Sequence, residues 1–123
     1  MQGNIKVESW NEELVSELGC GGKVTKARVS QVYSGDLIGE SRVEYTMFYD
    51  NVGNAEFMGF EVFNGTLQGK ECEIIFRHSG QFDSGVVVSQ FAIFNVSEAT
   101  LIEGYRGALK SSGGKQASYI IQK

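Results

Sequence analysis

His78 is the one histidine of the chain, and it lies in a run of residues typical of a β-hairpin. A two-residue turn at Gln68-Gly69, where glycine supplies the positive φ that hairpin turns favour, fixes the strand pairing by counting. In that register Gly59 lies opposite the imidazole and leaves space beside it. Glu61 becomes the diagonal neighbour of His78, about 7–8 Å away at the backbone, so the two side chains can meet.

These two residue types permit three kinds of role. An ionised carboxylate inside an apolar barrel costs several kcal/mol of folding free energy unless it is paired, and His78 is the nearest candidate partner of Glu61. The pair could exchange protons with a substrate during enolisation or isomerisation, or it could form the polar end of a ligand pocket. It could equally belong to an internal hydrogen-bond network that fixes the strand register. The sequence leaves these alternatives open.

The strand face that carries Glu61 and His78 is otherwise mostly apolar, so we predict that it points inward. A short repeat, aromatic-x-Gly-x-Leu-x-Gly, begins at Tyr33 and again at Phe63. If each copy ends in a tight turn, the first turn falls at residues 38–39, and Tyr33 pairs with Glu44 inside the barrel. The opposite face of that hairpin is also apolar, so the sequence does not decide which of its two faces points into the barrel. The candidate ligand-binding residues are therefore Glu61, His78, Glu44, Tyr33, Phe63 and Phe76.

The elements that position these residues are predicted to be strands. Sixteen glycines, no proline and many β-branched and aromatic residues are typical of an antiparallel all-β domain. Closing eight such strands removes exposed edges, which predicts a single eight-stranded antiparallel β-barrel. A capping-box pattern from Ser9 to Glu12 predicts one short helix that ends by Gly19. The expected strands cover residues 4–10, 24–33, 41–49, 54–66, 71–80, 86–95, 101–109 and 117–122.

We expect one domain over residues 1–123, with an N-terminal strand and connecting segment at 1–22 and the barrel core at 23–123. The net charge of −4 and the scattered basic residues argue against nucleic acid as a partner. The chain has no long apolar run and no charged-then-apolar leader, so we expect no membrane contact and a cytoplasmic location. A single histidine and scattered carboxylates predict no metal and no cofactor.

The hairpin of the expected strands 54–66 and 71–80 has an outward face that is too apolar to be fully exposed to water. Met58, Phe60 and Val62 alternate there with polar residues. Exposed apolar patches mark contacts between proteins, so we expect a homo-oligomer.

Four segments resemble an uncharacterised bacterial family of small proteins, a domain of unknown function with an allene oxide cyclase-like barrel. The segments are the stretch around Trp10, "VYSGDLIGESRVEYTM", "FEVFNGTLQGKECEIIFRHSGQFDSG" and "LIEGYRGAL". The resemblance covers nearly the whole chain from Val24 onward and implies an eight-stranded, oligomeric barrel with a central cavity. The residues that match the family pattern are Gly35, Gly39, Glu44, Glu61, Gly65, Gly69, His78, Gly80 and Arg106.

This resemblance implies the fold and does not by itself imply cyclase activity, because function belongs to the site and not to the fold. We therefore predict a barrel that binds a small, largely apolar molecule, whose polar end is held by Glu61 and His78 with Tyr33 or Glu44. One alternative is a cofactor-independent isomerase or cyclase that uses Glu61 and His78 as an acid–base pair. Another is a structural or interaction protein with an interior packed solid.

Overall fold

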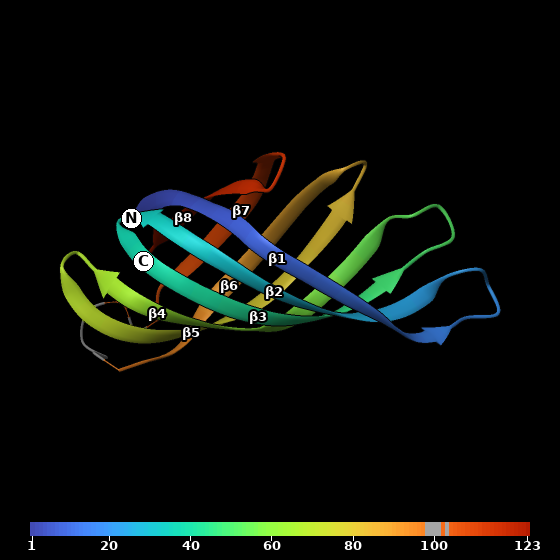
Figure 1. Ribbon diagram of the computed structural model, residues 1–123, viewed down its shortest axis with the longest axis horizontal. Helices are drawn as coiled ribbons and strands as arrows, with labels where there is room; N and C mark the ends of the chain where they lie inside the picture. The colour runs from blue at the N-terminus through green and yellow to red at the C-terminus, as the bar shows by residue number, and fades with distance from the viewer. Residues whose placement is uncertain (98–101, 103) are drawn as a thin grey trace.

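Eight antiparallel strands close into a barrel in the computed structural model of the protein (Figure 1). The structure describes residues 1–97, 102 and 104–123, and these form no helix, so none is present that could cross a membrane. The predicted eight-stranded antiparallel barrel is confirmed. Its strands are β1 (Gln2–Glu17), β2 (Lys23–Gly35), β3 (Leu37–Tyr49), β4 (Ala55–Leu67), β5 (Lys70–Asp83), β6 (Val86–Val96), β7 (Arg106–Gly113) and β8 (Gln116–Gln122).

The pairing of β4 with β5 follows the register expected from the turn at Gln68-Gly69. Gly59 lies opposite His78, and Glu61 lies opposite Phe76. Glycine at 69 takes a φ of 86°, as a hairpin turn of this kind requires. The turn was therefore sufficient to place Glu61 and His78 on one face, and the apolar residues around them correctly predicted that this face points inward.

The predicted helix after Ser9 is wrong, because β1 continues as a strand to Glu17. Its residues pair with β2 along nearly the whole length of that strand, with register shifts near Glu8 and Val15. A short helix lacks the stabilisation of tertiary packing, whereas a strand here gains a complete ladder of hydrogen bonds to β2. The Glu12 carboxylate, expected to cap a helix, instead accepts a hydrogen bond from Thr25 across the sheet.

The predicted register of the first hairpin is also wrong. The chain turns at Gly35, which has a φ of 100°, so Tyr33 lies opposite Gly39 and not Glu44. The slip of five residues (44 minus 39) is odd, and an odd slip turns every side chain of β3 to the other face. Glu44 therefore lies outside the barrel, and its neighbour Val43, on the opposite face of the strand, lies inside.

Gly39 misled the prediction because its role is close packing and not a turn. A Cβ atom at this position would lie 2.3 Å from the carbonyl oxygen of Asn64 on β4. Gly39 lies directly opposite Gly65, and Leu37 lies opposite Leu67, so the last three residues of the first copy of the repeat face the second copy across β3 and β4.

The strand expected at 101–109 begins later than predicted, at Arg106. Gly104 has a φ of 83° and lies in a turn closed by a hydrogen bond from the Tyr105 amide to the Ile102 carbonyl, 3.0 Å long. Residues 98–101 and 103 lie outside the described part of the chain, so the expectation for them is not addressed.

The barrel interior is divided into two apolar halves by a layer of polar side chains. Along β2 the order is Val29, Gln31, Tyr33, and along β4 it is Phe57, Glu61, Phe63. The half that contains Tyr33 and Phe63, here called the filled half, is built from Ile5, Tyr33, Leu37, Phe63, Leu67, Ile74, Phe76, Phe91, Ile93, Val96, Ile102, Leu109, Ala117, Tyr119 and Ile121. The open half, at the other end, is built from Ala27, Val29, Val43, Tyr45, Met47, Ala55 and Phe57. The polar layer between them comprises Gln31, Ser41, Glu61, His78 and Ser89.

Candidate functional site

Glu61 is the centre of the polar layer. Its Oε1 atom lies 2.5 Å from Nε2 of His78, and its Oε2 atom accepts a hydrogen bond of 2.6 Å from the Tyr33 hydroxyl. Both Glu61 and His78 are essentially inaccessible to solvent. The structure thus brings together three of the residues that the sequence suggested, and it explains how the buried carboxyl group is satisfied.

The polar layer continues on both sides of Glu61. Nδ1 of His78 lies 2.9 Å from Oγ of Ser89, and Nε2 of Gln31 donates to Oε2 of Glu61 over 3.1 Å. Gln31 also donates to Oγ of Ser41 over 3.3 Å. Within the described part of the chain, no fully buried side-chain nitrogen or oxygen lacks a hydrogen-bond partner.

Ser89, His78 and Glu61 have the composition of a nucleophile triad, but their position does not suit one. A nucleophilic serine must reach a substrate, and the Ser89 side chain is completely buried in the barrel wall. The imidazole that would activate it faces Glu61 on one side and Ser89 on the other. This arrangement satisfies buried groups and leaves none of the three free to meet a substrate.

Burial raises the pKa of the Tyr33 hydroxyl well above its ordinary value, and the neighbouring Glu61 carboxyl group raises it further by charge and by hydrogen bonding. The Tyr33 hydroxyl is therefore a permanent donor to Glu61. Burial also raises the pKa of Tyr45, whose ring meets the His78 ring edge-on with centroids 5.8 Å apart.

A cavity of about 380 Å³ occupies the open half, above the polar layer. It lies at the end of the barrel where β1 joins β2, β3 joins β4, β5 joins β6 and β7 joins β8; the chain termini lie at the other end (Figure 1). Five aromatic residues contribute to its wall, and Gln31 is the member of the polar layer that borders it. The lining is Val7, Trp10, Glu12, Gln31, Tyr45, Met47, Tyr49, Phe57, Phe82, Val87, Leu109, Ser111, Gly114, Lys115, Gln116 and Ala117.

A hydrogen-bonded carboxylate, Glu12, organises the mouth of this cavity. Its Oε2 atom accepts from Thr25 over 2.6 Å and from Tyr49 over 2.7 Å, and its Oε1 atom accepts from the indole of Trp10 over 2.9 Å. Burial alone would raise the pKa of Glu12, but these hydrogen bonds outweigh it and leave the pKa lowered. Sequence reasoning missed this group, although Trp10, Glu12 and Leu14 have the two-residue spacing of one strand face.

The aromatic residues proposed from the sequence lie in the filled half and not around the cavity. The Tyr33 ring packs against Phe63 and Phe76, with centroids 5.2 Å and 6.4 Å apart. None of these three side chains borders the cavity. Neither Glu61 nor His78 borders the cavity, whereas Gln31, which donates a hydrogen bond to Glu61, does.

The placement of Glu44 in the cavity is wrong. Its carboxylate lies on the outer surface, where it pairs with Lys26 over 3.4 Å and with Arg28 over 3.5 Å. The odd register slip described above is the physical reason, because it exchanges the two faces of β3.

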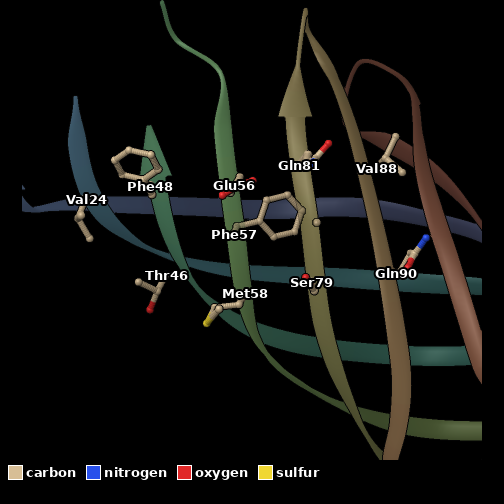
Figure 2. A pocket seen from close by; sticks show the side chains of 11 residues that line it. Val24, Thr46, Phe48, Glu56, Phe57, Met58, Ser79, Gln81, Val88 and Gln90 are labelled. Carbon is tan, nitrogen blue, oxygen red and sulfur yellow. The ribbon is translucent and has the colours of Figure 1, made fainter. Parts of the chain in front are cut away.

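The outer wall has a hollow of its own, with a volume of about 560 Å³ (Figure 2). Met58, Phe48 and Val88 line it and remain exposed to solvent by 65%, 42% and 42% of their surface. Polar side chains line it as well: Gln81 lies between Phe48 and Val88, and Gln90 lies beside Val88 (Figure 2). Because its lining mixes exposed apolar side chains with polar ones, this hollow is a weaker candidate for a small-molecule site than the apolar cavity inside.

The described residues include no group of three His, Cys, Asp or Glu side chains close enough to hold a metal ion. What they do define is a closed eight-stranded β-barrel with a polar layer and an apolar cavity at one end. The chain belongs to the family described as "Protein of unknown function (DUF3224)", whose model matches residues 1–122. No curated protein matches the chain.

Proposed function

We propose that the protein binds a small, largely apolar molecule in the open half of the barrel. The observation that carries this proposal is the cavity of about 380 Å³, whose wall is mainly apolar and aromatic. Small-molecule sites have this character, with volumes from about 300 Å³ upward and a few polar groups that set orientation.

The exposure of apolar side chains at the mouth supports the same proposal. Trp10 borders the cavity with 44% of its surface exposed, and Leu14, which follows on the same strand face, is 56% exposed. A bound apolar molecule would remove part of this surface from water, at a gain of about 25 cal/mol per Å².

The proposal differs from the sequence-based one in the polar contact. Gln31 borders the cavity and takes the place that Glu61 and His78 were expected to fill. An isomerase that uses Glu61 and His78 has no specific observation in its favour, because each of these groups already faces the other. The likeness to allene oxide cyclase and the homo-oligomer both stay predictions.

Carbon-13 labelling of the methionine methyl groups tests binding and reports its location. The chain has three methionines: Met47 lines the cavity, Met58 lines the outer hollow, and Met1 lies at the opposite end of the barrel. Titration with propylbenzene should move the Met47 signal in a saturable manner and leave the Met58 and Met1 signals nearly unchanged.

A matched variant, Val7→Phe, places a larger side chain in the cavity wall beside Gln31, its partner on β2. The variant should stay folded and lose the Met47 response to propylbenzene. The proposal is overturned if propylbenzene leaves the Met47 signal of the wild type unmoved, or if the Met58 signal is the one that shifts.

A further inference from the structure

We propose that the side-chain carbonyl of Gln31 is the recognition point of the cavity, and that its natural ligand carries a hydroxyl or N–H donor at the buried end. This inference rests on the proposed binding function and specifies the chemistry of the ligand. The observation behind it is an acceptor without a partner. Oε1 of Gln31 accepts no hydrogen bond from any described residue, and it keeps some accessible surface, because every fully buried side-chain oxygen among these residues has a partner. The residue as a whole is only 7% exposed and borders the cavity.

The polar layer fixes which end of the Gln31 amide faces the cavity. Its Nε2 atom has two hydrogens, one donated to Oε2 of Glu61 and the other to Oγ of Ser41. If the amide were turned over, its carbonyl oxygen would face the carboxyl oxygen of Glu61, and two acceptors would repel each other. The carbonyl therefore points away from Glu61.

Glu61 holds the Gln31 amide in this orientation whether its own carboxyl group is ionised or protonated. Oε1 faces the His78 ring, so a proton on the carboxyl group would lie on that side, between Oε1 and Nε2. Oε2 remains an acceptor in both states and receives the Tyr33 hydroxyl as well as the Gln31 amide. Tyr33 keeps its proton because burial raises its pKa, so it does not become a competing acceptor.

The role of the buried network follows from this geometry. Glu61 is a positioning residue that acts through Gln31, and it makes the floor of the cavity an acceptor and not a donor. A ligand hydroxyl or N–H would satisfy the Gln31 carbonyl, whereas an ether or ketone oxygen would bring a second acceptor against it. Leaving a buried acceptor unpaired is costly, so the site discriminates between these two kinds of ligand.

Two probes of nearly equal shape test the inference: 4-propylphenol, which has a hydroxyl donor, and 4-propylanisole, whose methyl ether has none. Calorimetric titration of the wild-type protein should give about tenfold or tighter binding of the phenol. In Gln31→Met the preference should fall to about twofold or less. A control variant, Gln90→Met on the outer hollow, should keep the full preference of the wild type.

A spectroscopic readout keeps the test independent of the folding of Gln31→Met. The side-chain carbonyl carbon of Gln31 should move downfield with the phenol and stay in place with the anisole. Equal affinity for the two probes would overturn the inference and leave the binding barrel standing. If neither probe binds or moves the Met47 methyl signal, the proposed function is overturned and the inference falls with it.

Discussion

The two halves of the barrel are built on the same strands, yet one is filled and the other is hollow. In the filled half, side chains from all eight strands converge, and large ones such as Phe63, Ile74 and Phe76 leave no surface exposed. In the open half, the buried apolar side chains come from β2, β3 and β4 alone. The β7–β8 hairpin lines the cavity there, but its strands span only 8 and 7 residues while β1 spans 16. The cavity therefore lies at the end where the strands differ most in length, so the proposed binding and the stability of the fold depend on different ends of the molecule.

The seam between β1 and β8 shows how this difference is made. β8 pairs with β1 only as far as Lys6, and the last contact is a hydrogen bond from the Val7 amide to the Lys115 carbonyl. From Glu8 to Glu17, β1 pairs with β2 alone within the described residues. β1 thus continues along the cavity end of the barrel well beyond the last residue that it pairs with in β8 (Figure 1).

The largest effect is expected in the layer that separates the two halves. Glu61→Leu deprives His78, Tyr33 and Gln31 of their shared hydrogen-bond partner, and breaking a buried pair costs about 3–5 kcal/mol of unfolding free energy. Glu44→Leu is the matched control, because its ion pairs are exposed and worth at most about 1 kcal/mol. Urea unfolding of both variants measures the difference, and similar losses would show that the polar layer contributes no more than the surface.

The next largest effect should come from removing side-chain volume, which should lower the unfolding free energy more in the filled half than in the open half. Ile74→Ala creates a void in the filled half and should cost about 4 kcal/mol, whereas Met47→Ala enlarges an existing cavity and should cost about 2 kcal/mol. Denaturant midpoints at equal slope provide the comparison. A larger loss for Met47→Ala than for Ile74→Ala would contradict the assignment of the halves.

Addition of volume should give the opposite contrast. Val96→Phe overpacks the filled half and should cost about 1–3 kcal/mol. Val7→Phe finds room in the cavity, so its melting temperature should stay close to that of the wild type. Calorimetric melting of both proteins checks this expectation, which fails if Val7→Phe is destabilised as much as Val96→Phe.

The smallest expected effect is the loss of stability in acid that comes from Glu12 at the mouth of the cavity. The lowered pKa of Glu12 means that its hydrogen bonds stabilise the folded state fully above about pH 4.5, the ordinary value, and lose that contribution as the pH falls further. Glu12→Gln should therefore show a weaker loss of stability between pH 5 and pH 3 than the wild type. Melting curves across that range, with Glu13→Gln as the control, measure the difference, and identical slopes would contradict it.

The parts of the fold that were predictable from sequence depend on local chemistry. The turn at Gln68-Gly69 fixed the β4–β5 register, and with it the approach of Glu61 to His78. The same reasoning failed for the first hairpin, because Gly39 looks like a turn glycine but is instead needed where β3 and β4 pack closely together. The helix after Ser9 failed because a capping box is local, whereas the pairing of β1 with β2 is not.

The site was harder to predict than the fold, because it depends on what is missing from the wall. The two-residue spacing of Trp10 and Glu12 places them on one strand face, but no motif in the sequence indicates that β8 stops short of the mouth and that this face lines a cavity. The orientation of Gln31 likewise depends on contacts with Ser41 on β3 and Glu61 on β4. Side-chain alternation indicated that Gln31 and Tyr33 share one face, and only the closed barrel showed which of them borders the cavity.

The most direct test of the two-halves account is a crystal structure of the protein under xenon pressure. Xenon enters apolar cavities of sufficient size and is excluded from well-packed cores. The account predicts xenon density in the open half, in contact with Met47 and Phe82, and none around Phe63 and Phe76. Absence of xenon from the open half, or equal density in both halves, would contradict it.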